Sequence, residues 1–328
     1  MKDKRFKFVV LLVLALMLFA RCADAANTKP LDDKTFLNLC ANGTAREVEN
    51  AIKAGANIKA VGNEISFRGD RGFSSSYNWT TLMVAAVFNS DLEVITVLVK
   101  NGADVNAKNT TAPAEWINPD GHTALMRVAS EWRRQEESNN SAIEVITALV
   151  KNGADVNART SDGWTALMYA YGYDVITALI EKGADVNARN ANDETPLMWA
   201  GLNSGAESVK ALIRAGADVN ARDRFGKTVL IRAAERESQQ EEIAVLIKNG
   251  ADINARDVNG YTALMHAVMN FRPSRGNPNP EATIITLLKN GADAKLKDDN
   301  GKMAIDYAKD NENIANTDVF WKLNDASY

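Results

Sequence analysis

The sequence contains few of the residues that build catalytic and metal sites. Only two of its 328 residues are cysteine and two are histidine. His122 and His266 lie far apart in the chain, and no group of Cys and His residues has the spacing of metal ligands. The glycines stand singly rather than in the G-x-x-x-x-G-K-S/T pattern that holds phosphate groups. These absences argue against an enzyme, and we expect no catalytic residue, no cofactor and no metal ion.

The sequence also lacks an apolar run long enough to cross a bilayer comfortably. Its longest run, Phe8–Ala20, is shorter than the roughly 20 residues that a membrane-spanning helix needs. Four basic residues precede it and Ala23-Asp24-Ala25 follows it, which is typical of a signal peptide over residues 1–25, cleaved after Ala25. We therefore expect a periplasmic or secreted protein. Membrane association would require that this segment is retained as an anchor, or that Cys22 is lipidated, which the preceding Arg21 disfavours.

Charge and cysteine content limit the partners and the means of stabilisation. The chain has 42 acidic and 38 basic residues, a formal net charge of −4. An acidic protein is a poor candidate for nucleic-acid binding, which depends on dense Lys and Arg. Cleavage would leave Cys40 as the one remaining cysteine, so that no internal disulfide could form. Cys40 occupies a small-residue position in FLNLCANG, where we expect a buried thiol.

One short tract, by contrast, recurs along most of the chain. KNGADVNAR stands at Lys151–Arg159, and its close variants carry the same Gly-Ala-Asp core. The variants are Lys100–Lys108, Glu181–Arg189, Arg214–Arg222, Lys248–Arg256 and Lys289–Lys297, with a diverged copy at Lys53–Val61. A tract that returns at a period of roughly 33 residues indicates a repeat architecture.

Each repeat is predicted to be a helix–turn–helix unit, as Asp162–Arg189 illustrates. Thr165 is placed to cap a short helix, and an apolar stripe later in the unit predicts a second helix. Gly183 suits the left-handed conformation that ends that helix. Asp185 and Asn187 are turn-forming residues that are expected to bond their own backbone. The recurring tract is thus explained as the end of one helix pair and the turn before the next.

Units that open with T-x-L-x-x-A and close with G-A-D-V-N-A resemble the ankyrin repeat. The openings are Thr80–Met83, Thr123–Met126, Thr165–Met168, Thr195–Met198, Thr228–Ile231 and Thr262–Met265. The resemblance implies an all-α repeat solenoid of about eight stacked helix–turn–helix units joined by β-hairpin-like loops. After the signal peptide and a linker at 26–32, the repeat domain would span residues 33–328. The expected units are 33–61, 78–108, 120–159, 162–189, 192–222, 225–256, 259–297 and 300–325.

The chain departs from the family pattern at one recurrent position. The family opening is usually Thr-Pro-Leu-His, but here methionine replaces the histidine in five openings. These residues are Met83, Met126, Met168, Met198 and Met265. A row of methionines could bind copper or form an apolar groove. Because they recur once per unit beside other apolar residues, we expect them to pack in the interior.

The resemblance places the residue just before each opening threonine on a concave face that contacts partners. These residues are Trp79, His122, Trp164, Glu194, Lys227 and Tyr261. Trp and Tyr dominate the energetics of many interfaces, so we predict protein binding by Trp79, His122, Trp164 and Tyr261. Trp116, in an insertion, is a further predicted binding residue. Phe225 and Arg224 join the prediction because Arg222, Arg224 and Arg236 form a basic patch that would favour an acidic partner.

Insertions lengthen some turns and inter-helix connections, at residues 62–78, 109–120, 130–141 and 270–280. Loops often carry function, although drift of a tolerated surface explains each insertion equally well. The predicted function is a non-catalytic, monomeric scaffold that binds a protein outside the cytoplasm. The alternatives are an envelope-anchored spacer without a specific ligand, and an enzyme with a site in the insertions.

Overall fold

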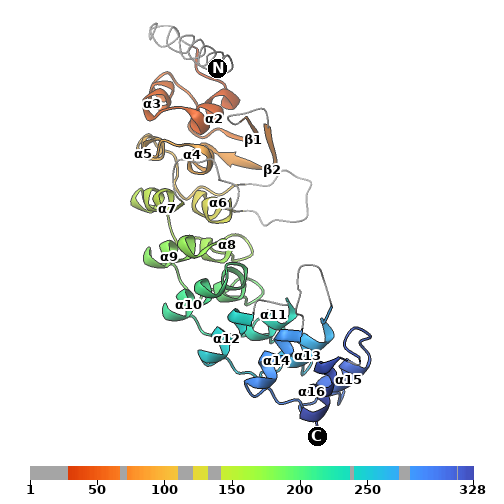
Figure 1. Ribbon diagram of the computed structural model, residues 1–328. Coiled ribbons are helices and arrows are strands. Elements are labelled where there is room, and N and C mark those ends of the chain that lie inside the picture. Colours follow the sequence, from red (N-terminus) through yellow and green to blue (C-terminus); the bar gives the residue numbers. More distant parts are fainter. Residues whose placement is uncertain are drawn as a thin grey trace, which may run out of the picture. The chain divides into compact units, whose positions relative to one another are not determined.

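The computed structural model describes residues 29–66, 72–109, 121–131, 142–236, 240–272, 281–315 and 317–328. Helices dominate these residues, and they follow one another in antiparallel pairs (Figure 1). The chain forms two compact parts, which we call the N-terminal part (to Asp155) and the C-terminal part (from Val156). The predicted signal peptide at 1–25 and the predicted binding residue Trp116 lie outside the described residues.

The N-terminal part contains three helix pairs and one β-hairpin among its described residues. The helices are α2 (Asp33–Asn42), α3 (Ala45–Lys53), α4 (Thr81–Phe88), α5 (Glu93–Lys100), α6 (Ala124–Glu131) and α7 (Ala142–Lys151). Strands β1 (Val61–Ser66) and β2 (Gly72–Thr80) pair antiparallel, with Ile65 opposite Phe73 and an irregularity between Gly62 and Glu64. The insertion at 62–78 therefore extends the hairpin between the first two helix pairs, as the sequence suggested.

The C-terminal part contains five successive helix pairs among its described residues. They are α8 (Ala166–Tyr169) with α9 (Tyr173–Glu181), η2 (Leu197–Gly201) with α10 (Ala206–Arg214), α11 (Val229–Glu235) with α12 (Gln240–Lys248), α13 (Ala263–Met269) with α14 (Glu281–Lys289), and α15 (Ala304–Lys309) with α16 (Asp318–Ala326). Element η2 is a π-helix rather than an α-helix. First helices pack on first helices, such as α11 on α13, and second helices on second helices, such as α10 on α12.

The first helix of most pairs begins at the predicted threonine cap. The hydroxyl of Thr165 accepts a hydrogen bond from the Met168 N–H at 3.4 Å, and Thr262 accepts one from Met265 at 3.3 Å. Such a bond satisfies one of the backbone N–H groups that a helix start leaves without an intrahelical acceptor. Thr195 differs, because the Met198 N–H donates to its backbone carbonyl at 3.0 Å instead.

The second helices of seven of the eight described pairs end at the predicted glycine, and the exception is α16, which ends at Ala326. Gly183 has φ of 89°, and the following Ala184 N–H donates to the Leu179 carbonyl. Glycine is favoured there because a Cβ atom strains the left-handed conformation. The turn after it also behaves as predicted at Asp185, whose carboxylate accepts the Asn187 N–H at 2.9 Å.

The asparagine of the repeated tract has a different role from the one predicted. The Asn187 side chain bonds the next unit rather than its own turn: Nδ2 donates to the Gly216 carbonyl at 2.9 Å, and Oδ1 accepts from the Asp218 N–H at 2.8 Å. Asn157 and Asn220 form the same pair of bonds to the units that follow them. Arginine adds a parallel series, since Arg222 Nη1 donates to the Arg256 carbonyl at 2.6 Å. The tract recurs partly because it joins neighbouring units.

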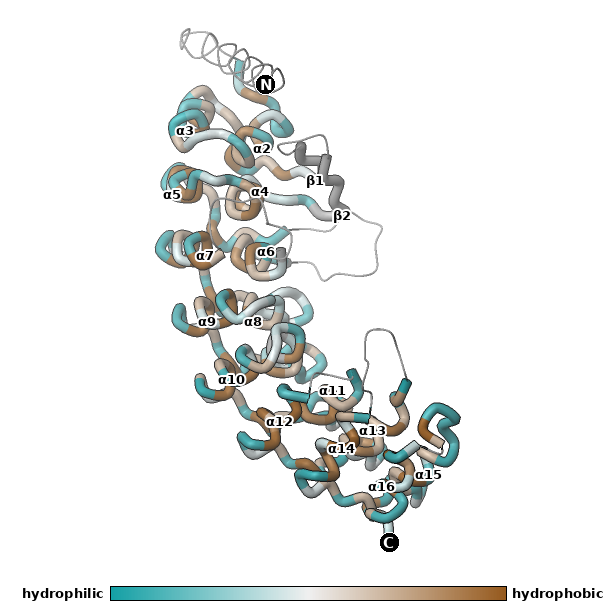
Figure 2. The backbone as a smooth tube through the Cα atoms, in the orientation of Figure 1, coloured by the Kyte–Doolittle hydropathy of each residue, from teal (hydrophilic) through white to brown (hydrophobic). Residues whose placement is uncertain are grey.

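The interior of both parts consists mainly of small and aliphatic side chains, with a few aromatic rings such as Phe36 and Trp79. Figure 2 shows hydrophobic segments recurring within the helices and hydrophilic segments in the turns. The five methionines of the openings are at most 3% exposed, which confirms that they pack internally. Cys40 is fully buried in α2, also as predicted, and burial raises the pKa of its thiol to about 12.

Candidate protein-binding surface

The residues just before the opening threonines were predicted to face a partner, and we call them the first column. The structure corrects this prediction at two positions in the N-terminal part. Trp79 and His122 are 1% and 3% exposed, so neither side chain offers a surface to a partner in this conformation. Trp79 lies at the end of β2, where its ring packs 5.4 Å from Phe88 and 5.1 Å below the guanidinium of Arg127. The neighbouring side chains cover the large apolar ring, because removing its surface from water is favourable. A binding role for either residue stays a prediction.

The same column is partly covered in the C-terminal part. Glu194 is buried, whereas Trp164, Lys227 and Tyr261 are half-buried. Trp164 and Tyr261 therefore retain some surface for a partner. Their predicted role in binding is compatible with these positions but is not tested by them.

A second column, four residues after each cap position, was missed by the sequence analysis. Its members are Arg127, Tyr169, Trp199, Arg232, His266 and Tyr307. One turn of helix carries each of them back over the hairpin that precedes its helix. A regular spacing in the sequence could have revealed this second column. In three units an Asp precedes the second-column residue by nine positions and bonds it: Asp223 with Arg232, Asp257 with His266, and Asp298 with Tyr307.

Three aromatic rings meet where the first two units of the C-terminal part adjoin. The Trp164 ring stacks on Tyr169 with centroids 5.0 Å apart, and it packs against Trp199 at 4.9 Å. Trp164 precedes α8, Tyr169 ends it, and Trp199 lies in η2. All three side chains are half-buried, so the cluster is supported from below and still reaches the surface.

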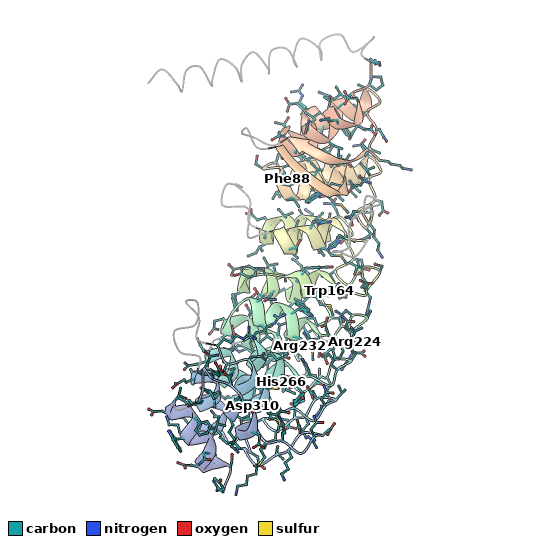
Figure 3. The ribbon with its side chains drawn as sticks, turned by 90° about the vertical axis from the view of Figure 1, so that its right-hand side faces the viewer. Phe88, Trp164, Arg224, Arg232, His266 and Asp310 are labelled. Atoms are coloured by element: carbon teal, nitrogen blue, oxygen red, sulfur yellow. The ribbon has the colours of Figure 1, made fainter. Side chains whose placement is uncertain are left out.

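A charged cluster adjoins these rings. Arg232 Nη2 lies 2.5 Å from Glu194 Oε1 and 2.6 Å from Asp223 Oδ2, and the three side chains are 12%, 7% and 0% exposed. Burial raises the pKa of Glu194, but the hydrogen bond from Asn190 and the adjacent Arg232 outweigh it and hold that pKa below its usual value. Figure 3 shows Arg232 near Trp164 in the same part, with Arg224 at a similar level. One guanidinium thus compensates two buried carboxylates.

Arg236 supplies a second guanidinium near the rings. Its Cζ atom lies 4.9 Å from the centroid of the Trp199 ring, and Nη1 donates to Asn203 Oδ1 at 3.4 Å. The pKa of Arg236 is lowered, first by partial burial and then by the like charge of Arg232. The residue itself is exposed. We call Trp164, Tyr169, Trp199, Arg232 and Arg236 the Trp199 patch.

The charged row continues beyond the Trp199 patch into the next units. Lys227 pairs with Glu235, whose carboxylate is also 3.3 Å from His266 Nδ1. The other ring nitrogen of His266 lies 2.9 Å from Asp257 Oδ2. These bonds lock the first helices to the hairpins beneath them. Each ring nitrogen of His266 thus has a carboxylate partner, which suits a structural role.

The repeat that carries Trp199 is irregular in two further ways. Asp193 has φ of 59° and is the one non-glycine residue with positive φ among those described. The corresponding position holds glycine in neighbouring units, as at Gly163 and Gly226. The helix that follows is the π-helix η2. Strained residues and π-helical turns concentrate at functional sites, and here both lie beside one surface patch.

Phe225 and Arg224, two further predicted binding residues, lie in the turn before α11. Phe225 is 46% exposed, and the Arg224 guanidinium lies 4.6 Å from the centroid of its ring. Val258, in the next turn, is 59% exposed and donates its N–H to the Phe225 carbonyl. Exposed apolar side chains in adjacent turns form a small surface that a partner could cover.

Comparisons with known proteins agree with this architecture. The family model for ankyrin repeats in three copies matches residues 111–190, 136–223 and 197–298, and the single ankyrin repeat matches 77–110. The chain belongs to the ankyrin repeat family. No curated protein matches it. The ankyrin matches span residues 77–298, so the assignment of the first and last helix pairs as ankyrin units, and the boundaries of all units, stay predictions.

The chain belongs to a family whose repeats generally mediate protein–protein interaction. Among the described residues, no three His, Cys, Asp or Glu side chains are grouped to hold a metal ion. The described part of the chain also contains no helix long and apolar enough to cross a membrane. The Trp199 patch consists of Trp, Tyr and Arg side chains, the residue types that are enriched at the centres of protein interfaces.

Proposed function

We propose that this protein is a non-catalytic scaffold that binds another protein, and that the Trp199 patch is the centre of its binding surface. Ankyrin repeats generally mediate protein–protein interaction and are usually non-enzymatic. The observation that carries the location is the clustering of Trp and Arg side chains from three successive repeats around Trp199, whose own repeat is the one described repeat with a strained residue and a π-helix.

The Trp199 patch has the structure expected of an interface hot spot. Trp, Tyr and Arg are the types whose truncation costs most at interfaces, especially where neighbours hold them in one conformation. Arg232 is fixed by Asp223 and Glu194, and Trp164 and Trp199 are fixed by each other. A partner would therefore find these side chains already ordered, and binding would cost little further side-chain entropy.

Export is the second part of the proposal. The basic start, the apolar run Phe8–Ala20 and the small residues Ala23 and Ala25 support cleavage after Ala25 and a periplasmic or secreted location. Determination of the N-terminal residue of the protein, purified from the host that makes it, tests this directly. A chain that begins at Ala26 supports export, whereas an intact Met1 would contradict cleavage.

Paired substitutions and affinity capture test the binding function. Trp164→Ala and Trp199→Ala together should abolish capture of the native partner, with cross-links in the wild type mapping to residues 160–236. Tyr173→Ala is the matched control, because this aromatic residue at the start of α9 is 45% exposed and does not belong to the Trp199 patch. Equal capture by all variants would support the alternative of a spacer without a specific ligand.

Two controls separate loss of binding from loss of structure. The double variant should keep the helical circular dichroism of the wild type, and size-exclusion chromatography should show the expected monomer in both. Cross-links confined to the insertions would instead place the binding site outside the Trp199 patch.

A further inference from the structure

The arginines in and around the Trp199 patch differ in whether a carboxylate lies within ion-pair distance of them. Arg232 is bonded to two carboxylates, and Arg256 is 2.9 Å from Asp299. Arg236, by contrast, has no carboxylate within ion-pair distance among the described residues, where its guanidinium donates one long hydrogen bond, to Asn203. The exposed charge of the patch is therefore a cation held over an aromatic ring.

The nearby acidic groups cannot serve Arg236 without giving up other bonds. Asp223 is fully buried, and it accepts backbone N–H bonds from Phe225 and Lys227 as well as the bonds from Arg232. Glu194 is held by Asn190 at 2.7 Å and by Arg232. The Cζ atoms of Arg232 and Arg236 lie 5.8 Å and 4.9 Å from the centroid of the Trp199 ring, so two like charges repel each other beside one ring. A carboxylate from outside would offset that repulsion.

We propose that Arg236 binds a carboxylate of the partner, and that the partner segment carries an Asp or Glu side chain next to an apolar side chain that packs on Trp164 and Trp199. The inference rests on the proposed function and specifies its ligand chemistry. The planar guanidinium of Arg236 can bind a carboxylate through two parallel hydrogen bonds. The adjacent rings provide the apolar contact.

Phosphate-bearing partners fit the patch less well. Binding a nucleic-acid backbone requires several cations that are free to pair with successive phosphates. Of the two cations in the Trp199 patch, Arg232 already pairs with Glu194 and Asp223, which leaves Arg236 to meet an anion from outside. One available cation suits a single carboxylate better than a run of phosphates.

Selection from a phage-displayed library of random dodecapeptides tests this inference. Peptides enriched on the wild-type chain should carry an Asp or Glu beside an aromatic or branched aliphatic residue. Arg236→Gln should weaken their binding about tenfold or more, since a charge-assisted bond is lost. Changing the peptide's acid to its amide should cause the same loss, and combining the two changes should add little.

Arg214→Gln is the matched control, because Arg214 is an exposed arginine at the end of α10 and does not belong to the Trp199 patch. It should leave affinity within about twofold, and both variants should unfold at the same urea concentration as the wild type. Enriched peptides without acids, or equal losses in Arg214→Gln and Arg236→Gln, would overturn the carboxylate assignment while leaving the binding function intact.

Two other outcomes are equally informative. Failure to enrich any peptide over the Trp164→Ala/Trp199→Ala variant would refute the proposed binding centre, and the carboxylate assignment with it. Tighter binding of a thymidine oligonucleotide than of the best peptide would replace a protein ligand with a nucleic acid.

Discussion

Replacing Arg232 by methionine should strongly destabilise the C-terminal part. Methionine keeps much of the length and apolar contact of the arginine stem, so the change removes chiefly the charge. Glu194 and Asp223, which are 7% and 0% exposed, would then be left without their shared cation. Removing one partner of a buried ion pair costs about 3–5 kcal/mol. Because Asp223 keeps two backbone N–H bonds, we expect a loss near the lower end, about 3 kcal/mol.

Urea unfolding followed by circular dichroism measures this loss, with hydrogen exchange in α11 as a local readout, since a repeat array need not unfold in one step. Glu194→Gln in the Arg232→Met background should recover part of the loss, because one uncompensated charge is removed. A cost below about 1 kcal/mol for Arg232→Met alone would show that water, rather than Arg232, compensates these carboxylates.

Lowering the pH should weaken the stabilising contribution of Glu194. The pKa of Glu194 in the folded chain lies below its ordinary value of 4.5. The group therefore contributes stability that is present above pH 4.5 and is lost as the pH falls through the lower folded-state pKa. Without Arg232 the part of this contribution that the arginine provides disappears, while the part from Asn190 remains, so the stability difference between wild type and Arg232→Met should shrink below pH 4.5. A difference that grows on acidification would refute the assignment.

Three further predictions concern the repeat framework. Asn187→Ala removes two bonds between units and should cost about 1–2 kcal/mol in urea unfolding, whereas Asn290→Ala, which loses one bond within its own helix, should cost less; equal costs would refute the inter-unit role. Asp193→Gly should raise stability by about 0.5–1 kcal/mol, because relief of left-handed strain exceeds the added flexibility of the unfolded chain, and a lowered melting temperature would contradict this. Cys40 should react with a thiol reagent only after unfolding, and reaction in the native protein at pH 8 would show that α2 opens locally.

Most of the repeat framework could be predicted from the sequence because its signals are local. Thr165 caps a helix through a bond three residues away, and Gly183 ends one through its own backbone conformation. Met168 was expected inside because it recurs beside apolar neighbours, and it is buried. Each of these outcomes depends on residues within one turn of helix, so a short stretch of sequence suffices.

The binding surface could not be predicted in the same way, because burial there depends on the neighbouring unit. Trp79 and Trp164 occupy equivalent positions in the repeat, yet the first is enclosed by Phe88 and Arg127 and the second remains half-exposed. Asn187 and the nine-residue spacing from Asp223 to Arg232 could be seen in the sequence. The bonds that these residues form could be seen only in the structure.

The sequence by itself thus determined the repeat, its caps and stops, and the family to which the chain belongs. Only the tertiary structure decided which recurring side chains reach the surface and which charges are already compensated. The physical reason is that a cap or a left-handed turn is fixed by covalent neighbours, whereas the exposure of Trp164 and the pairing of Arg232 are set by units stacked about thirty residues away.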